Sequence, residues 1–475
     1  MENRLYKILK KNKNVKNNFF KYESFTMSYF EMYEYVNKIS NKIALLNNRV
    51  SIILDNNMSY IACFFSIMKL NKVLIPLNHN ISEEDLLKSI KLCDINTLCT
   101  TSYYYNKFKD YLNSYKIDIY LVDIDELIIN HIFKEKIKYN YSIVLLTSGS
   151  TSKPKCVLLT DKALYHNSLL VAQSLNLSNN DKTIIMSQLC YSSTISQLLS
   201  NVMVGASIYF YQISIFIKKF DSIINENNIT NFVTVPSTIE LLCLHKKKDI
   251  KFNSLRFIGI AGAPFSKEKI KEIINLENKF EIVIMYGMTE LGPRVSHLFS
   301  KKEINKIGSV GKPLRGIKIK ILITDKVNQI GEVCVKSKSK FLKYYHNNIK
   351  NLFMNKYFKT GDIGYIDDDG YLYLCGREKN IIISNGINIY PEEIEESLKN
   401  HPSIKDARVY GEEEPIYGEI VVADILIKDN FNIEKKEIIN YINQTISFWK
   451  RPKKIYLVDK IEYTLNGKIR RNYER

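Results

Sequence analysis

The sequence lacks the features that would place it in several large classes of protein. It has no uninterrupted apolar run of the roughly 20 residues that a membrane-spanning helix needs, and its first residues, 1–14, are too polar for a signal peptide. Its eight cysteines include no Cys-x-x-Cys pair and have no histidine at metal-ligand spacing. We therefore expect a cytoplasmic protein without a membrane span, whose cysteines are buried, reduced thiols.

Acidic residues are outnumbered by basic ones, and 68 Lys and Arg against 50 Asp and Glu leave a formal charge of +18. A basic surface can bind nucleic acid through counterion release. However, no nucleic-acid-binding module accompanies basic runs such as 246–248. Lysine is enriched together with Asn, Ile and Tyr, which A/T-rich codons encode, so a solvated basic surface explains the charge. We predict no nucleic-acid partner.

Apolar segments of strand length alternate with amphipathic segments of helix length through the first third of the chain. The length of 475 residues and the hydrophobic content of 45% allow two or three packed units with a sizeable core. The alternation predicts an α/β fold with largely parallel sheets that are covered on both faces. The expected strands are 51–54, 73–76, 95–99, 117–122 and 142–146, and the expected helices are 59–70 and one that begins at Ser82.

The pattern changes further along the chain. Around 331–335 and 370–374, short apolar segments are separated by turns, as in a small β-barrel. After Lys379 a compact α+β pattern follows, with helices expected at 391–399 and 435–447, so we place a domain boundary there. At the other end, we expect the first 20 residues, rich in Asn and Lys, to be a poorly ordered leader.

A loop rich in hydroxyls and lysine, 147–155, connects the apolar runs 141–146 and 157–159. Its hydroxyls and backbone N–H groups can converge on the oxygens of a polyphosphate, and its glycine permits positive φ angles. The Walker spacing is absent, and the flanks indicate strand–loop–strand, so the loop is not that of a P-loop NTPase. A Ser/Thr/Gly loop alone is more often an ordinary turn. The residues that we assign to phosphate binding are Thr147, Ser148, Gly149, Ser150, Thr151 and Lys155.

Downstream motifs strengthen that assignment. They are Met285-Tyr286-Gly287-Met288-Thr289-Glu290, Lys359-Thr360-Gly361-Asp362, Cys375-Gly376-Arg377, 385–395 and 466–471. In this order and at these separations, the chain resembles the adenylate-forming superfamily: acyl- and aryl-CoA synthetases, firefly luciferase and the adenylation domains of nonribosomal peptide synthetases. The resemblance covers nearly the whole chain. It implies an N-terminal domain, 1–378, of layered α/β sheets with a small barrel-like subdomain, and a mobile α+β domain, 379–475, hinged near Lys379.

The resemblance also implies an activity. The chain would use ATP and Mg²⁺ to convert a carboxylic acid to an acyl-AMP with release of pyrophosphate, and would then transfer the acyl group to a thiol. Residues 388–391, Asn-Ile-Tyr-Pro, are more similar to CoA ligases than to peptide-synthetase domains. We therefore favour CoA as the acceptor, with the phosphopantetheine of an acyl carrier protein as the alternative.

Roles for individual residues follow from the resemblance. Glu290 would hold Mg²⁺, because this hard cation binds carboxylate oxygen and needs only one or two protein ligands; the alternative is a solvated loop glutamate. Thr289 would donate to the α-phosphate, and Asp362 would accept both ribose hydroxyls. Arg377 presents a planar fork to phosphate or ribose oxygens, or else joins the two domains. The adenine would lie between Tyr286 and the segment Gly262-Ala263-Pro264, next to Gly287 and Met288.

The small domain supplies the remaining groups that the resemblance implies. Lys468 would enter the active site and bridge the carboxylate and α-phosphate oxygens during adenylation. Removing such a transition-state contact would slow the reaction by roughly a hundredfold or more. A rotation at Lys379 would then withdraw Lys468 and bring the loop around Gly386 to the thiol channel.

The acyl pocket is expected around Tyr191 and Ser192, completed by Thr234, Gly262, Gly287 and Arg294. Amino-acid-activating relatives carry an aspartate at the position that aligns with Ser192, where it pairs with the substrate ammonium. Burying an ammonium without a partner is costly, so α-amino acids are disfavoured. A simple aliphatic or aromatic acid is favoured. Arg294 either meets a second carboxylate or hydroxyl of the acid or is structural.

The chain departs from the family pattern at Ser152 and Cys156, where glycine is usual. Ser152 brings a Cβ into a phosphate-facing turn, which puts the loop conformation and ATP affinity in question. An alternative is therefore a degenerate, nucleotide-binding regulatory protein without turnover. A nucleic-acid-binding role is the third possibility.

Overall fold

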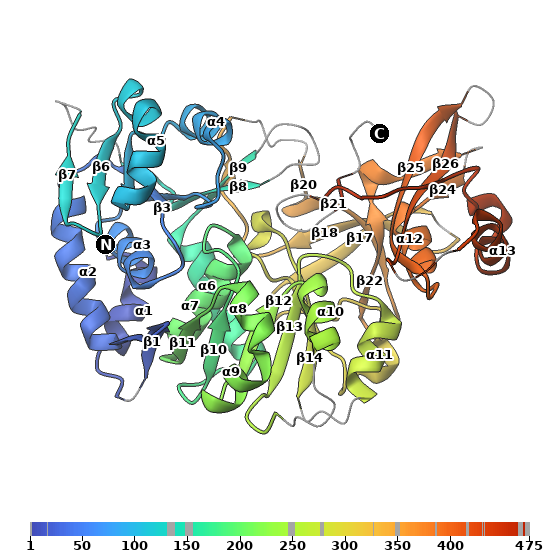
Figure 1. Cartoon of the computed structure of the whole chain (residues 1–475), viewed down its shortest axis with the longest axis horizontal. Coiled ribbons are helices and arrows are strands. Elements are labelled where there is room, and N and C mark those ends of the chain that lie inside the picture. Colours follow the sequence, from blue (N-terminus) through green and yellow to red (C-terminus); the bar gives the residue numbers. More distant parts are fainter. Residues whose placement is uncertain are drawn as a thin grey trace.

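The computed structural model describes residues 2–16, 18–130, 138–147, 155–245, 252–275, 280–325, 327–346, 352–384, 387–414, 418–429, 431, 433–463 and 469–470. Two large sheets, separated and flanked by helices, make up most of the molecule (Figure 1). Two smaller sheets follow them along the chain. This architecture confirms the predicted α/β class.

The first large sheet has eight strands in the order β19-β9-β8-β4-β3-β5-β6-β7. They are β3 (Arg49–Ile53), β4 (Val73–Pro76), β5 (Thr97–Thr100), β6 (Asp118–Leu121), β7 (Glu126–Ile128), β8 (Ile143–Thr147), β9 (Lys155–Leu159) and β19 (Lys343–Tyr344). The five strands expected from the sequence are present and pair in parallel. β9 returns antiparallel beside β8, which confirms the strand–loop–strand prediction for the hydroxyl-rich loop.

The second large sheet has nine strands in the order β16-β15-β14-β13-β12-β10-β11-β1-β2. They are β1 (Phe19–Tyr22), β2 (Phe25–Ser28), β10 (Lys182–Ile185), β11 (Ser207–Phe210), β12 (Asn231–Thr234), β13 (Phe257–Ala261), β14 (Glu281–Tyr286), β15 (Ser296–Phe299) and β16 (Lys312–Pro313). The five neighbouring strands β14, β13, β12, β10 and β11 pair in parallel, so their carboxyl ends lie at one edge of the sheet. That edge positions the site described below.

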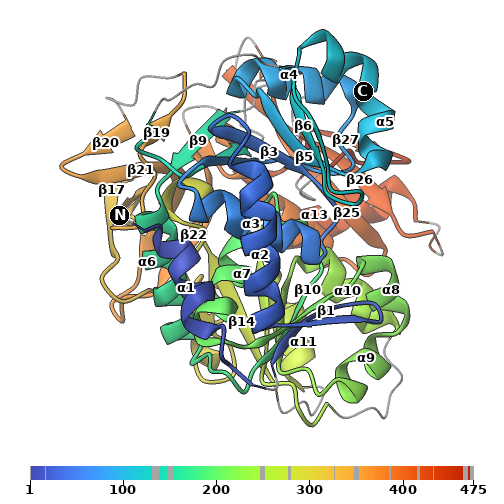
Figure 2. The same cartoon turned by 90° about the vertical axis from the view of Figure 1, so that its left-hand side faces the viewer.

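Helices cover both faces of each large sheet. They are α1 (Arg4–Asn12), α2 (Tyr29–Ile43), α3 (Met58–Lys69), α4 (Glu83–Cys93), α5 (Ser102–Ser114), α6 (Asp161–Ser174), α7 (Ser192–Val204), α8 (Ile213–Lys218), α9 (Phe220–Glu226), α10 (Pro236–His245) and α11 (Lys267–Asn275). The side chains of α1, α2, α3, α6 and α7 pack into the core between the sheets, and Figure 2 shows α1, α2 and α3 there. α4 begins as predicted, because Ser82 caps it and accepts from the Asp85 N–H.

Strand alternation explains why these sheets are apolar on both faces. In β3, Val50 and Ile52 belong to the core between the sheets, whereas Ile53 belongs to the outer core beneath α4 and α5. In β10, Ile185 faces the first core and Ile184 the core beneath α8 and α9. Successive side chains point to opposite faces, so burial on both sides requires the nearly continuous apolar runs that the sequence shows.

The prediction of a poorly ordered leader is wrong. Residues 4–12 form α1, whose Leu5 and Leu9 are both 0% exposed and which packs against α3, α6 and α7. Asn3 caps the helix by accepting from the Leu5 N–H, and Asn12 donates to the Val202 carbonyl at 2.7 Å. The apolar residues of this segment recur at helical spacing, and burial of that face outweighs its polar composition.

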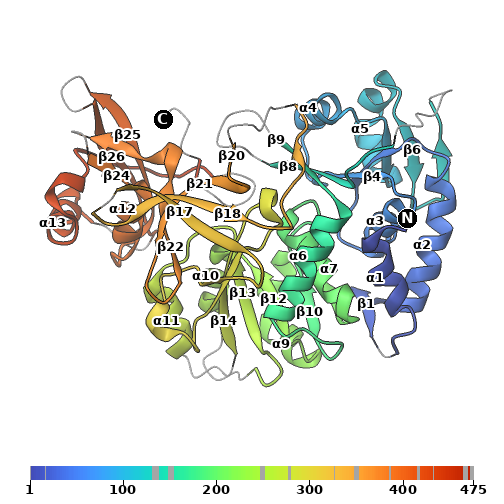
Figure 3. The same cartoon turned by 180° about the vertical axis from the view of Figure 1, so that it is seen from behind.

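The third sheet contains β17 (Lys318–Asp325), β18 (Ile330–Lys336), β20 (Phe353–Met354), β21 (Tyr357–Ile366) and β22 (Leu372–Arg377). The strands run in the order β17-β18-β21-β20, and β22 pairs with β21. Within the described residues these strands form an open sheet, so the short β-segments were expected correctly but the barrel does not close. Figure 3 shows this sheet between the nine-stranded sheet and the C-terminal strands.

Residues after Lys379 form a fourth sheet with its own apolar core. It contains β23 (Ile382–Ser384), β24 (Ile387–Ile389), β25 (Ile404–Glu414), β26 (Gly418–Ile427) and β27 (Lys454–Leu457), with α12 (Pro391–Lys399) and α13 (Lys435–Thr445) packed against it. Both helices were expected, and Pro391 opens α12 at a position where a missing N–H costs nothing. In the part of the chain that the structure describes, no helix has the length and apolar character needed to cross a bilayer.

Candidate active site

The parallel strands of the nine-stranded sheet deliver predicted site residues to one edge. Thr234 ends β12, Ala261 ends β13 just before Gly262, and Tyr286 ends β14 just before Gly287. In the register of the sheet, Thr234 pairs with Ile260, and Ala261 pairs with Met285. Gly262 has φ +95°, a conformation that a side chain would strain. Ala263 and Pro264 follow it in the same loop, so the segments assigned to adenine lie at neighbouring strand ends.

Three predicted nucleotide-binding residues meet beside this edge. The hydroxyl of Tyr286 donates to Asp362 Oδ2 at 2.6 Å, and Arg377 Nε lies 2.6 Å from Asp362 Oδ1. Arg377 also donates to the Thr360 carbonyl at 3.3 Å. Asp362 is only 5% exposed, so its charge is compensated inside the protein. Burial and the neighbouring Asp362 carboxylate raise the pKa of Tyr286 far above its usual value, which keeps the hydroxyl as a donor.

Glu290, the predicted metal ligand, is held by a residue that the sequence did not single out. Its side chain is only 8% exposed, and Oε1 accepts a hydrogen bond from the hydroxyl of Tyr344 at 2.8 Å. A backbone hydrogen bond joins the same two segments, because the Phe341 N–H donates to the Glu290 carbonyl at 2.7 Å. Lys155 Nζ lies 5.0 Å from the centre of the Tyr344 ring. The aromatic ring therefore links the predicted metal ligand to the end of the phosphate loop.

The predicted acyl pocket adjoins this group. Ser192 Oγ and Thr289 Oγ1 lie 2.9 Å apart, so the first residue of α7 contacts the motif that contains Glu290. Tyr191 precedes it, and its hydroxyl accepts from Asn78 Nδ2 at 3.2 Å. Burial raises the pKa of Tyr191 to about 12. These contacts join the residues predicted for the acid to those predicted for the α-phosphate.

Three cationic side chains lie near one another beside these residues. Lys379 lies in a short 3₁₀ turn, Glu378–Asn380, between β22 and β23. Burial lowers its pKa, and the positive charges of Lys155 and Arg377 lower it further. Like charges at this separation repel one another, and an anion bound between them would relieve that repulsion. This field suits a polyphosphate.

Some predicted residues lie outside the described residues. They are Ser148, Gly149, Ser150, Thr151 and Ser152 of the predicted phosphate loop, Gly386, and Lys468. At the flanks of the loop, the Thr147 hydroxyl lies 3.5 Å from the Lys155 carbonyl. Cys156, one of the departures from the family pattern, is buried with its Sγ 3.2 Å from the Sγ of Cys93.

The backbone around Gly287 is crowded, which explains the glycine of this motif. A Cβ built on Gly287 would lie 2.2 Å from the Pro293 carbonyl oxygen. The following segment is fixed there, because the Val295 N–H donates to the Tyr286 carbonyl at 2.7 Å. Arg294 lies in this segment and is 3% exposed. Met288 is half-buried and packs against the large core.

The structure adds two candidate positioning residues that sequence reasoning missed. Tyr344 and Asn78 hold the predicted residues Glu290 and Tyr191 in place. Neither belongs to a recognisable motif, and Tyr344 is brought in by the two-residue strand β19. No local sequence signal marks such a short edge strand, so only the folded chain identifies its role.

Comparison with known proteins identifies the family of the chain. A sequence model of the family described as AMP-binding enzyme matches residues 10–345, and one described as AMP-binding enzyme C-terminal domain matches residues 393–468. The chain therefore belongs to the AMP-binding enzyme family. It is an AMP-forming acid–thiol ligase, which uses ATP to convert a carboxylic acid to an acyl-AMP and then to a thioester.

Proteins of similar sequence include two 2-succinylbenzoate–CoA ligases. A 2-succinylbenzoate–CoA ligase from Bacillus licheniformis is 31% identical over 337 residues, which cover 69% of this chain and 68% of that protein. The protein of the same name from Bacillus subtilis is 26% identical over 465 residues, 95% of this chain and 93% of that protein.

Solved structures share the fold. The o-succinylbenzoate CoA synthetase from Bacillus subtilis, in complex with its acyl-adenylate intermediate, has a TM-score of 0.85 at 24% identity and covers 98% of this chain and 97% of that chain. ATP-bound MatB from Rhodopseudomonas palustris has a TM-score of 0.86 at 19% identity, with coverage of 99% and 98%.

Proposed function

We propose that this chain activates 2-succinylbenzoate, or an acid with the same pair of carboxylates, and transfers the acyl group to CoA. The alignment with 2-succinylbenzoate–CoA ligases along almost the whole chain carries the proposal. The contact between Ser192 and Thr289 supports it, because it joins the acid side of the site to the nucleotide side without a carboxylate that would suit an ammonium.

Within this function, the buried group of Tyr286, Asp362 and Arg377 is proposed to bind the ribose and adenine of ATP. Asp362 would exchange its partner Arg377 for the ribose hydroxyls, and the freed guanidinium would then meet phosphate oxygens. Lys155, Lys379 and the loop that follows Thr147 would neutralise the polyphosphate. Thr289 would donate to the α-phosphate. The mutual proximity of these groups supports the assignments.

Glu290 is the proposed ligand of Mg²⁺. Among the described residues, no group of three His, Cys, Asp or Glu side chains could hold a metal ion. Mg²⁺ at a nucleotide site does not need such a group, because one or two carboxylates together with water and phosphate complete its coordination. Glu290 fits this requirement, since Tyr344 orients one of its carboxylate oxygens. The ion would neutralise charge that develops on the phosphates.

Domain motion is the proposed link between the two half-reactions. We place the boundary at Lys379, with residues 1–378 on one side and 379–475 on the other. The separate core of the C-terminal sheet supports it. Rotation there would exchange Lys468 for the loop around Gly386 beside the acyl-AMP. A Lys468→Ala variant should lose roughly a hundredfold or more in pyrophosphate exchange while still binding ATP. Equal exchange in both proteins would contradict the role of Lys468.

The substrate proposal is tested by mass spectrometry of the product. The protein is incubated with ATP, Mg²⁺, CoA and 2-succinylbenzoate, and the expected product is the corresponding CoA thioester together with AMP. A parallel reaction with a phosphopantetheinylated carrier protein in place of CoA tests the other acceptor. Thioester from a different acid in a broad panel, with none from 2-succinylbenzoate, would contradict the substrate. Acylation of the carrier alone would contradict the acceptor. Cytoplasmic location remains a prediction from the sequence.

A further inference from the structure

Arg294 is a buried cation with little compensation from the protein. Its side chain is 3% exposed, and Nη1 donates to the adjacent Pro293 carbonyl at 2.9 Å. Across the described ranges, no Asp or Glu lies within salt-bridge distance of its guanidinium. Burial lowers its pKa to about 10. A guanidinium has five N–H donors, and a buried charge without a counter-ion is expensive, so this arrangement requires an explanation.

The position of Arg294 is fixed by its backbone. Asn167 Nδ2 donates to the Arg294 carbonyl at 2.9 Å, and the close approach of Pro293 to Gly287 holds the preceding residue. These contacts anchor the main chain on both the Gly287 side and the α6 side, and the bond from Nη1 to the Pro293 carbonyl orients the side chain. The guanidinium is held where it is.

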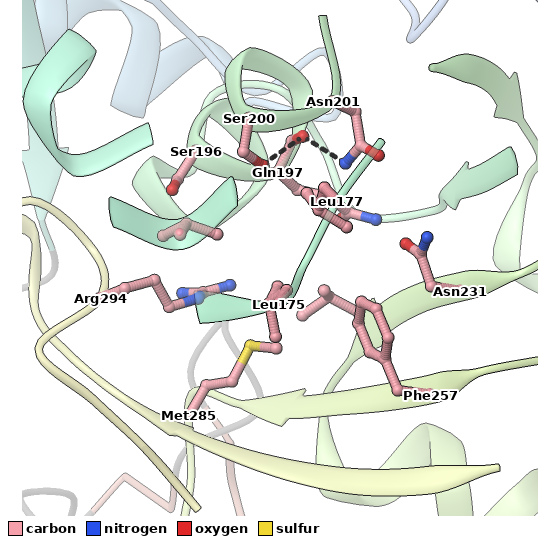
Figure 4. Close-up of a pocket in the computed structure, with 12 residues that line it drawn as sticks. Leu175, Leu177, Ser196, Gln197, Ser200, Asn201, Asn231, Phe257, Met285 and Arg294 are labelled. Atoms are coloured by element: carbon pink, nitrogen blue, oxygen red, sulfur yellow. Dashed lines mark hydrogen bonds between the residues drawn. The ribbon is translucent and has the colours of Figure 1, made fainter. Parts of the chain in front are cut away.

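Arg294 lines a small internal cavity of about 10 Å³ between α6, α7 and the nine-stranded sheet. Figure 4 shows its guanidinium directed into the space enclosed by these elements. The polar side chains of the lining are Ser196, Gln197, Ser200, Asn201 and Asn231. Within the described residues, Asn201 Oδ1 is buried and finds no donor. Ser196, Gln197 and Ser200 already form hydrogen bonds inside the protein, so the guanidinium of Arg294 is the charged group that a ligand entering this space would meet.

The cavity lies along the same face of α7 as the contact between Ser192 and Thr289. Ser192, Ser196 and Ser200 are four residues apart on α7 and therefore share one face of the helix. Ser192 contacts Thr289, while Ser196 and Ser200 line the cavity. Four residues of helix correspond to about 6 Å, so the cavity begins about one helical turn from the contact with Thr289. Met285, whose flexible thioether also lines the cavity, is the wall that can move to enlarge it.

We propose that Arg294 is a specificity-determining residue that binds a second carboxylate of the acid substrate, so that the enzyme selects dicarboxylic acids whose carboxylates are separated by at least one helical turn. This inference rests on the proposed ligase function but not on 2-succinylbenzoate as the substrate. The carboxylate accepts two parallel N–H bonds from the guanidinium. The unpaired buried cation thereby gains its counter-ion only when the correct acid is bound.

The test compares matched acids. Pyrophosphate exchange is measured with 2-succinylbenzoate against 4-oxo-4-phenylbutanoate, which lacks the ring carboxylate, and with adipate against hexanoate. We expect the natural chain to favour the dicarboxylate in kcat/KM, and the ratio within each pair to fall about 100-fold in Arg294→Gln, mainly through KM. Arg294→Lys should fall less, about 10-fold, because it keeps a point charge without the fork.

Arg315→Gln is the matched control, because Arg315 is an exposed arginine of the same region, and its ratio should equal that of the natural chain. A ratio that Arg294→Gln leaves unchanged, or a natural chain that does not prefer dicarboxylates, overturns the proposal. If Arg294→Gln fails to fold by circular dichroism, the natural chain and Arg294→Lys decide.

The same panel separates the two proposals. Discrimination within the adipate pair, without activity on 2-succinylbenzoate, supports Arg294 and rejects that substrate. Turnover of 2-succinylbenzoate without discrimination between the acids of each pair supports that substrate and rejects the role of Arg294. If no acid supports exchange, thermal unfolding of the ATP-bound protein is measured with each pair, and the absence of a larger shift from the dicarboxylates overturns the role of Arg294.

Discussion

The nucleotide end and the acid end of the proposed site both contain buried charges, but they differ in whether the protein supplies partners for those charges. At the nucleotide end, the charge of Asp362 is matched by Arg377 and Tyr286, and that of Glu290 is stabilised by Tyr344. At the acid end, Arg294 is as deeply buried, but among the described residues its side chain donates only to the neighbouring Pro293 carbonyl. The protein itself compensates the first group of charges, whereas in our proposal the second carboxylate of the acid compensates the charge of Arg294.

This difference suits the two ends to different roles, positioning of the nucleotide and selection of the acid. Paired carboxylates are held in a defined geometry before any ligand arrives, so in the proposed site the nucleotide would bind by exchanging partners, at a small net cost. An unpaired buried cation gains most of its stabilisation on binding, and only from an acid that carries the right second charge. If both proposals hold, the nucleotide end serves every acid substrate, while Arg294 discriminates among them.

The largest effect that probes the nucleotide end should come from Glu290→Gln. An amide cannot supply the negative charge that a divalent cation needs, so acyl-AMP formation should slow by about 100- to 1000-fold. Pyrophosphate exchange at saturating ATP measures it. Tyr344→Phe is the matched control, since it removes the hydrogen bond to Oε1 and leaves the carboxylate, and it should cost less than about 10-fold. Equal losses in the two variants would mean that Glu290 acts only through its contact with Tyr344.

A smaller effect is expected at Asp362. Asp362→Asn removes the charge that holds Arg377, whose Nε lies 2.6 Å away, and one acceptor for the ribose. We expect KM for ATP to rise by about 10- to 100-fold, because charge-assisted hydrogen bonds contribute about 1.5–3 kcal/mol each. Tyr286→Phe, which deletes only the hydroxyl that donates to Asp362, should raise it a few-fold. A KM that is unchanged in Asp362→Asn, in a protein that still unfolds cooperatively, would contradict the pairing argument.

The smallest effect concerns stability beside Arg294. Burial, and then the charge of Arg294, lower the pKa of His297 to about 3. The unfolded chain binds a proton near pH 6.5 whereas the folded chain does not, so stability is full above pH 6.5 and falls as the pH drops towards 3. The slope is about 1.4 kcal/mol per pH unit. Urea unfolding at pH 7 and pH 5 should show a loss about 2 kcal/mol larger in the natural chain than in His297→Gln. The same pH dependence in both would assign the acid sensitivity to other groups.

Much of the fold and of the nucleotide end could be predicted from the sequence, because local patterns carry them. The strands of the first sheet are apolar on both faces, and α12 begins at Pro391 as expected. The Tyr286 and Asp362 motifs are 76 residues apart in the sequence, and the folded chain joins them by a hydrogen bond. Motif spacing predicted a common site but could not supply that contact, since it depends on how the third sheet packs against β14.

The rest depended on tertiary packing. The first 20 residues are polar on average, yet the apolar face of α1 finds a buried groove that composition does not reveal. The closure of the small barrel was expected from short β-segments, but neighbouring strands alone do not determine whether a sheet closes. The two possibilities for Arg294 could not be separated either, because only the surroundings of a side chain show whether its charge is matched.

The docking of α1 also bears on how the chain is synthesised. This helix is synthesised before the segment that it binds, because its Asn12 bonds to Val202, which is 190 residues further along the chain. At about 5–20 residues per second, the helix waits roughly 10–40 s for its binding groove to exist. During that interval its apolar stripe is exposed to water, and slower elongation before residue 202 would lengthen the exposure.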